Sequence, residues 1–322
     1  MASVPLAWWL GVLSMPWLYC VGIVLGMCSV AGGAAEQLVL TFLVGRDAMI
    51  DAQAKFTLTE SLARVSGPGL AGLLVQAVTA PVAVLVDAAG ILFSGWMLGR
   101  IRIDEPEPAP AQQHPLADMR DGLLFIWRTA LLRVLALAVG LWHVLMYASG
   151  ALGILFATRE LGLSPGALGA AQMIGGMGGL ASSFLVRTLT ARFGQMATVQ
   201  IGLAMTTLSF LMTPLIPAAP FGYPAAAVLL YGASTFIFVC GLFIFLLPYV
   251  ALRQKVTPDA MLGRMISTMR FLTVGCAPLG ALAGGALGQL LGVRPALLAI
   301  ALLAAFLCVC MLASRTVRSV RS

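Results

Sequence analysis

Charge is scarce in this sequence. Only 10% of its 322 residues are Asp, Glu, Lys or Arg, and 60% are hydrophobic, whereas soluble domains carry about 25% charged residues. The mean hydropathy is +0.99. Because so few charges cannot cover a surface in water, the composition excludes a soluble globular protein. It predicts an all-α bundle that crosses the membrane several times.

The sequence also lacks the patterns that enzymes and metal sites require. It contains no zinc-protease motif, nucleophile elbow or acidic cluster for a metal. The glycines from Gly175 to Gly179 lack the Lys-Ser or Lys-Thr of a phosphate loop, and their spacing favours close helix packing. The six cysteines lie in apolar segments without metal-ligand spacing, which is typical of small buried hydrophobic residues. We therefore expect no enzyme, no cofactor and no bound metal.

Long apolar runs fill the chain instead. A hydrocarbon core of about 30 Å requires about 20 apolar residues per helix. By that measure the sequence predicts nine full membrane spans, and one apolar segment, residues 2–14, that is too short to cross. The spans are residues 17–43, 57–78, 81–99, 132–157, 166–187, 196–216, 224–250, 265–291 and 295–313.

Basic residues alternate from one side of the predicted membrane to the other. Short cytoplasmic loops are enriched in Lys and Arg. Basic residues such as Arg253 and Lys255 mark every second connection and the tail, whereas the opposite connections hold only Arg159 and Arg294. The pattern predicts a bacterial-type inner membrane protein whose long middle connection and C-terminus are cytoplasmic. The net charge of +7 is thus a topology signal, and we expect no nucleic-acid partner.

An acidic, proline-rich stretch from Asp104 to Pro110 divides the chain. It predicts an incomplete N-terminal helical half over residues 1–103, a cytoplasmic linker over 104–131 and a six-helix half over 132–322. Within the linker, apolar residues from Leu123 to Trp127 between flanking arginines predict a helix at the membrane interface.

Two distant stretches share one design. Gly67-Pro68-Gly-Leu-Ala-Gly72 lies in an apolar run, and Cys276-Ala-Pro278-Leu-Gly-Ala-Leu-Ala-Gly-Gly285 lies in another; an Asp-Ala-Met triplet precedes each. Proline removes a helical hydrogen bond, and small residues allow close approach of a second helix. We expect kinked membrane helices packed tightly against a partner.

This repetition indicates a duplicated block of helices, which is typical of secondary transporters. The block after the linker has six predicted spans, and the block before it has three. If the halves are equivalent, the first lacks about two and a half helices. We expect an N-terminally truncated version of a twelve-helix protein.

Several motifs resemble those of the major facilitator superfamily, in the drug-exporting branch that includes the enterobactin exporter and related transmembrane secretion effectors. The Gly67-to-Gly72 run resembles the antiporter signature of the fifth helix, Leu43-Val-Gly-Arg46 resembles loop four, and Thr257-Pro-Asp-Ala-Met-Leu-Gly-Arg264 resembles loop ten. The resemblance implies that the spans are helices four to twelve. It also implies that Arg187-Thr-Leu-Thr-Ala-Arg192-Phe-Gly194 is the counterpart of the superfamily's basic loop between helices two and three.

Ionisable groups inside a membrane are costly and therefore candidates for function. His143 lies near the predicted midplane, and Tyr147 follows one turn later on the same face. His143 could exchange protons near neutral pH, or it could be a hydrogen-bonded histidine between packed helices. The resemblance places its helix along a central cavity, which Glu36 and Gln37 would face from helix four. Asp87 could exchange a proton or hold a packing hydrogen bond.

Other residues could control conformation. Glu60 and Arg64 stand four apart in the order that favours a helical ion pair, although Arg64 could also reach the headgroups. The set of candidates for a conformational or antiporter role is Glu60, Arg64, Gly67, Pro68, Gly72, Arg187, Arg192, Gly194 and Pro278.

The expected function is export of small amphipathic molecules, drug-like or siderophore-like, by alternating access coupled to protons. The alternative is a truncated, non-transporting membrane remnant or scaffold. The expected partners are the lipid bilayer, a small-molecule substrate and protons, with a monomer as the expected oligomeric state.

Overall fold

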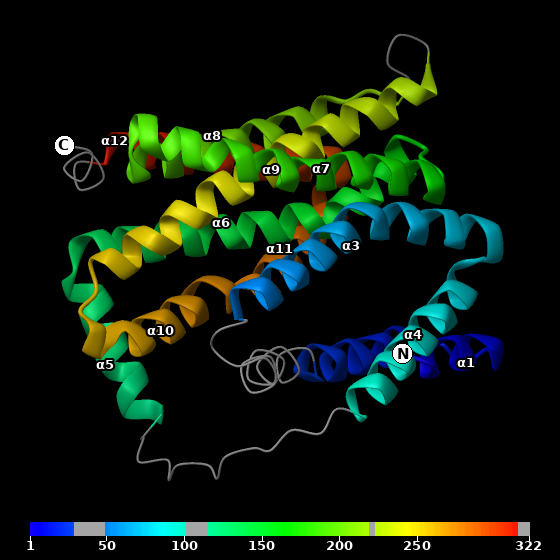
Figure 1. Cartoon of the computed structure of the whole chain (residues 1–322). Coiled ribbons are helices and arrows are strands. Elements are labelled where there is room, and N and C mark those ends of the chain that lie inside the picture. Colours follow the sequence, from blue (N-terminus) through cyan, green and yellow to red (C-terminus); the bar gives the residue numbers. More distant parts are fainter. Residues whose placement is uncertain (29–48, 101–114, 219–222, 315–322) are drawn as a thin grey trace. The chain divides into compact units, whose positions relative to one another are not determined.

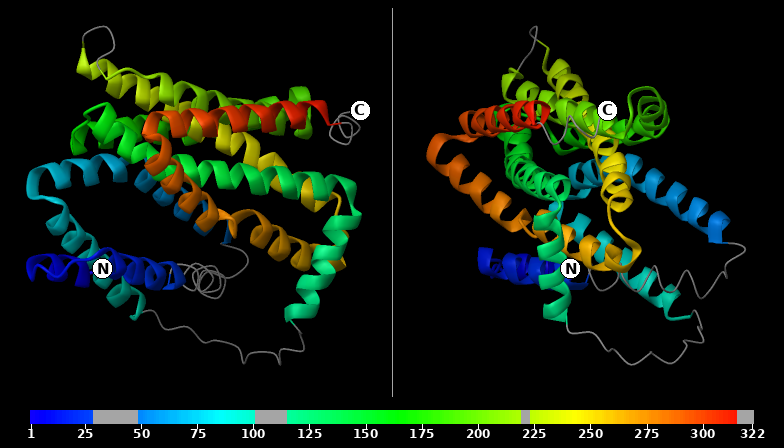
Figure 2. Two further views of the ribbon diagram at one scale, coloured as in Figure 1. Left: turned by 180° about the vertical axis from the view of Figure 1, so that it is seen from behind. Right: turned by 90° about the vertical axis from the view of Figure 1, so that its left-hand side faces the viewer.

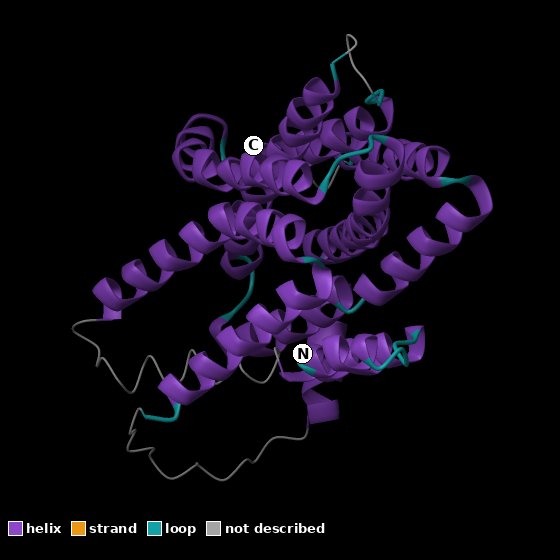
Figure 3. Ribbon diagram, turned by 90° about the vertical axis from the view of Figure 1, so that its right-hand side faces the viewer, coloured by secondary structure: helices purple, strands orange, loops and turns teal. Residues whose placement is uncertain are grey.

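The computed structural model describes residues 1–28, 49–100, 115–218 and 223–314, and over these residues it contains helices and loops but no strand (Figures 1 and 3). The all-α prediction is confirmed there. The chain divides into two compact units, Met1–Pro110 and Ala111–Ser322. In the described part, six helices are long and apolar enough to cross a membrane: Ala80–Leu98, Ala130–Glu160, Gln195–Leu215, Ala225–Lys255, Leu262–Leu291 and Val293–Ala313.

Three of the nine predicted spans are not in this set. Residues 57–78 are helical within α3 (Met49–Val78), and residues 166–187 are helical within α7 (Pro165–Phe193). Charged residues in α3 and the many glycines in α7 lower their mean hydropathy. The predicted span 17–43 begins as the apolar helix Met15–Cys28, and its remainder lies outside the described residues.

The first unit is small. It contains α1 (Ser3–Trp9), the helix Met15–Cys28, α3 and α4 (Ala80–Leu98). Helix α4 packs against both α1 and α3. With only seven residues, α1 fits the expectation that residues 2–14 are too short to cross a membrane.

The second unit begins with α5 (Pro115–Arg128) and α6 (Ala130–Leu155), which ends in the π-helical turn η1 (Phe156–Glu160). Helix α7 is followed by α8 (Gln195–Met212), the 3-10 turn η2 (Thr213–Leu215) and α9 (Pro224–Lys255). After the turn η4 (Asp259–Met261) come α10 (Leu262–Val274), α11 (Ala277–Leu291) and α12 (Val293–Ala313).

Glycines draw the helices of the second unit together. Helix α9 lies between α7 and α8. A side chain at Gly178 would collide with the backbone of Phe236, and one at Gly202 would collide with the backbone of Phe245. The predicted close packing of the glycine-rich stretch in α7 is therefore confirmed.

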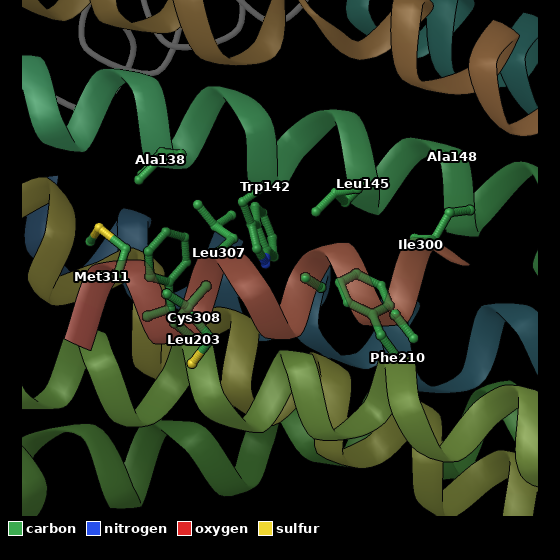
Figure 4. Packing of buried hydrophobic residues seen from close by; sticks show 14 of the residues in the cluster. Ala138, Trp142, Leu145, Ala148, Leu203, Phe210, Ile300, Leu307, Cys308 and Met311 are labelled. Atoms are coloured by element: carbon green, nitrogen blue, oxygen red, sulfur yellow. The ribbon is translucent and has the colours of Figure 1, made fainter. Parts of the chain in front are cut away.

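Helix α6 is the centre of the other contacts in this unit. It packs against α10, α11 and α12, and α12 also packs against α8; Figure 2 shows α11 crossing α6. The fully buried Trp142 points from α6 toward α12 and α8, and Leu203, Leu307 and Cys308 lie on one side of it in the same buried region (Figure 4). This apolar cluster forms the core of the unit.

The two proline stretches differ. The kink predicted for the second is present as an interruption of the helix, where α10 ends at Val274 and Pro278 stands in the first turn of α11. In the first, Pro68 lies inside the continuous helix α3. A Cβ built at Gly67 meets no described atom within 4 Å. The expectation of tight packing at Gly67 is thus not met within the described residues.

Three helix pairs are joined by a single residue of the same backbone shape. Thr79 joins α3 to α4 with φ 81° and ψ 157°, Gly194 joins α7 to α8 with φ 83° and ψ 166°, and Gly292 joins α11 to α12 with φ 87° and ψ 161°. In each case the amide of the junction residue donates to the carbonyl four residues earlier, over 3.0, 2.9 and 3.2 Å. This conformation suits glycine, so Thr79 is the strained member.

Candidate functional site

His143 and Tyr147 form a stacked pair on α6. Their ring centroids are 6.4 Å apart, with an angle of 26° between the ring planes. His143 is buried, and its Nδ1 lies 2.8 Å from the carbonyl oxygen of Val139. A carbonyl oxygen can only accept a hydrogen bond, so Nδ1 donates and Nε2 is the basic nitrogen of the neutral ring. The predicted shared face is confirmed, and Nε2 is the atom at which a proton could bind.

Trp142, the residue before His143, packs α6 against α8 and α9. Its ring meets that of His143 edge-on, with centroids 5.1 Å apart and planes at 89°. The indole Nε1 donates to Thr206 Oγ1 of α8 over 3.1 Å. Phe238 of α9 stacks on the indole with a centroid distance of 6.3 Å. Since side chains of α8 and α9 both contact Trp142, the position of the adjacent histidine is fixed by this packing.

A row of glycines on α11 packs against another side of α6. Gly280, Gly284 and Gly288 stand four residues apart and face Val144, Ala148 and Leu152, which are also four apart. A Cβ at Gly284 would lie 2.5 Å from the carbonyl oxygen of Ala148. A shift of α11 must therefore move α6, because the two backbones are in contact.

An ion pair connects three chain segments at the ends of α6, η2 and α12. Arg294 Nε lies 2.9 Å from Glu160 Oε2, and Arg294 Nη1 donates to the carbonyl oxygen of Pro214 over 2.8 Å. The guanidinium also lies over the Phe156 ring, 5.1 Å from its centroid. The sequence analysis did not predict this pair, because its members are 134 positions apart. The available signal was that Arg159 and Arg294 are the only basic residues in the predicted external connections.

Two further arginines were also missed. Arg253, interpreted from sequence as a loop cation, is 9% exposed within the last turns of α9. Its guanidinium lies 5.0 Å from the centroid of the Tyr249 ring, and its Nε has no hydrogen-bond partner in the described part. Arg270 is exposed on α10. A charge within the predicted span 265–291 was the signal that could have found Arg270.

The predicted ion pair of α3 is present. Arg64 Nη2 lies 2.6 Å from Glu60 Oε1, and Arg64 Nε lies 3.1 Å from the same oxygen. Both side chains are more than half exposed. Gly67, Pro68 and Gly72 follow on the next turns of the same helix.

The remaining candidates do not join a common cluster within the described residues. Asp87 is exposed on α4, and no described residue forms a hydrogen bond or ion pair with it. Arg187 and Arg192 lie in the last turns of α7, with Arg192 over the Phe193 ring at 5.3 Å. The predicted basic loop is therefore helical as far as Phe193, and Gly194 alone turns the chain. Glu36 and Gln37 lie outside the described residues.

The helical architecture agrees with a family comparison. Residues 1–274 match the model of the Major Facilitator Superfamily. The chain belongs to this superfamily. It is accordingly a multi-pass membrane protein of a transporter family, as the motifs around Pro68 and Asp259 indicated. In the described part no group of three or more His, Cys, Asp or Glu residues could hold a metal ion.

A relative with an assigned function agrees with this family. The chain is 26% identical over 283 residues to the multidrug efflux pump Tap of Mycolicibacterium fortuitum; the match covers 84% of this chain and 65% of that protein. The chain thus spans slightly less than two thirds of that relative's length.

Two solved structures share the fold. A bacterial metal transporter matches with a TM-score of 0.58 and 18% identity, over 84% of this chain and 68% of that one. A bacterial homologue of the iron transporter ferroportin, in an inward-facing state, matches with a TM-score of 0.60 and 17% identity. That second match covers 86% of this chain and 66% of the ferroportin homologue.

Proposed function

We propose that this chain acts as a transporter that exports small amphipathic molecules from the cytoplasm by alternating access, with proton entry as the driving force. The observation that carries the proposal is the superfamily match over residues 1–274. The similarity to a multidrug efflux pump supports export of amphipathic substrates. Superfamily members of this kind act by rocking one helical repeat against another.

The proposal assigns helices by their order in the superfamily. Residues 1–103 form the N-terminal part, from the end of helix three to helix six, and residues 104–131 form a cytoplasmic linker. Residues 132–322 form the C-terminal half, helices seven to twelve. Nine full spans and one short segment lie in the inner membrane of a bacterial-type cell, with the C-terminus in the cytoplasm. The alternation of basic loops supports this orientation.

His143 is the proposed proton carrier, together with Glu36. The support for His143 is its geometry: Nδ1 donates to Val139, so Nε2 is the basic nitrogen of the neutral ring, and Tyr147 stacks alongside. A proton that binds on one side of the membrane and leaves on the other would couple the pH gradient to the movement of α6. Linkage between two sites is typically about 1–3 kcal/mol.

The test is proton-driven uptake of a fluorescent amphipathic dye by inside-out membrane vesicles with an imposed pH gradient. We expect His143→Ala and Glu36→Gln to abolish transport while protein levels stay near those of the unmodified protein. The matched control is His114→Ala, because His114 is the only other histidine and lies in the predicted linker. Wild-type transport with both His143 and Glu36 replaced would remove them from the mechanism. Absence of dye transport by the unmodified protein would contradict export of such molecules.

A further inference from the structure

Helix α5 has one face fixed to α10, and the fixed face is tightly packed. Ile126 is fully buried. A Cβ built at Gly122 would collide with Thr268 Oγ1 and lie 2.9 Å from the carbonyl oxygen of Arg264. The Asp121 carboxylate lies 3.8 Å from the Arg264 guanidinium. Helix α5 therefore lies directly against the first turns of α10, as Figure 1 also shows.

The opposite face of α5 is exposed and combines apolar and cationic side chains. Leu123, Leu124 and Trp127 are 42%, 45% and 50% exposed. Arg120 and Arg128 lie among them on the exposed side. Arg120 pairs with the neighbouring Asp121 at 3.7 Å, and because both side chains are well exposed this ion pair contributes little. We define these five residues, Arg120, Leu123, Leu124, Trp127 and Arg128, as the outer face of α5.

The helix that follows α5 determines where the outer face of α5 lies relative to the membrane. Thr129 alone separates α5 from α6, and the buried apolar residues of α6 begin at Leu131. A helix joined so closely to a membrane span must lie near the headgroups. Helices at this depth insert their apolar side chains at the boundary with the acyl chains, and their arginines reach the headgroups.

We propose that the outer face of α5 binds anionic lipid headgroups of the cytoplasmic leaflet and thereby anchors the start of α10 at the membrane surface. The proposal rests on the cytoplasmic orientation given under the proposed function. It does not depend on export. The chemical match is that this leaflet carries a negative surface potential, whereas the outer face of α5 carries the cations Arg120 and Arg128. The one acidic group at its edge, among the described residues, is Asp121, which lies 3.7 Å from Arg120 and 3.8 Å from Arg264.

The test uses the full chain in nanodiscs of phosphatidylcholine alone or of phosphatidylcholine mixed with phosphatidylglycerol. The measurement is hydrogen exchange of the backbone amides of residues 119–128. We expect phosphatidylglycerol to slow this exchange, with a contribution of about five-fold per arginine. High salt should reduce the slowing, because screening weakens exposed charges.

Paired variants separate charge from folding. Arg120→Gln with Arg128→Gln should abolish the response to phosphatidylglycerol, whereas Arg120→Lys with Arg128→Lys should keep it. Arg159→Gln, which removes one charge from an exposed site outside α5, should also keep it. Exchange of the amides around Trp142 reports whether each variant is folded.

Two results would overturn the proposal. One is identical exchange of residues 119–128 in the two lipid compositions, which would indicate that another protein segment covers the outer face. The other is a lipid response that persists in the double glutamine variant, which would place the lipid contact elsewhere. Because dye transport is not measured, a failure of the proposed export would leave this test intact.

Discussion

The stretches around Pro68 and Pro278 begin from similar sequences and reach different structures. In the second, the helix breaks between Val274 and Ala277, and the glycines of α11 lie against the backbone of α6. In the first, α3 continues through Pro68 for its full 30 residues. Small residues permit close packing, and in the second stretch the facing helix α6 is in contact with them.

The two stretches also end in the same turn made from different residues. Gly292 follows α11, and Thr79 follows α3, with φ values of 87° and 81°. Glycine adopts this conformation without steric cost, whereas a β-branched residue does not. The second unit therefore has a relaxed turn where the first has a strained one.

The largest expected effect comes from filling the contact between α11 and α6. Gly284→Ala places a Cβ 2.5 Å from the Ala148 carbonyl oxygen. Since the obstacle is backbone that cannot rotate away, we expect a loss of about 3 kcal/mol in the free energy of unfolding, the upper end of overpacking. The measurement is unfolding of the purified protein in mixed micelles, followed by circular dichroism.

Two matched variants test whether the loss of stability in Gly284→Ala comes from the contact between α11 and α6. A Cβ at Gly285 of the same helix, or at Gly90 of α4, meets nothing within 4 Å among the described residues. Gly285→Ala and Gly90→Ala should therefore be neutral or stabilise by up to about 1 kcal/mol. A loss at Gly90 equal to that at Gly284 would show that α4 has a close partner at that position.

An exchange of the turn residues should give the next largest effect. Gly292→Thr forces a β-branched residue into the left-handed region, at a cost of about 2 kcal/mol. Thr79→Gly relieves the same strain, and we expect a gain of about 1 kcal/mol, reduced by the greater entropy of glycine in the unfolded chain. The midpoint of thermal unfolding should fall in the first variant and rise in the second. A fall in both would show that the Thr79 side chain makes a stabilising contact that exceeds its backbone strain.

Local features of this chain follow from its sequence, and features that depend on distant contacts do not. Helices and the Glu60–Arg64 pair rest on neighbouring residues, and periodicity and four-residue spacing predict them. Proline alone does not decide an interruption, since α3 continues through Pro68 whereas the helix before Pro278 ends. The pair of Glu160 with Arg294 depends on how α6, η2 and α12 come together. The burial of Arg253 depends on the same tertiary packing, because sequence alone marked it only as a cation near a loop. For His143, the shared face with Tyr147 was predictable, whereas the support from Thr206 through Trp142 was not.

The smallest expected effect on stability concerns the ion pair of α3, where the functional effect would be larger. Both side chains are more than half exposed, so Arg64→Gln should cost only about 0.3–0.5 kcal/mol. If the pair controls the opening of the transporter, dye transport should instead fall by more than ten-fold in Arg64→Gln and in Glu60→Gln.

The reversed pair, Glu60→Arg with Arg64→Glu, keeps the attraction in the less favourable order along the helix. Transport restored by the reversal would assign the role to the pair itself. Transport lost in all three variants would indicate that Glu60 or Arg64 contacts another group during the transport cycle. Unchanged transport in the single variants would show that the pair contributes only to stability, and only slightly.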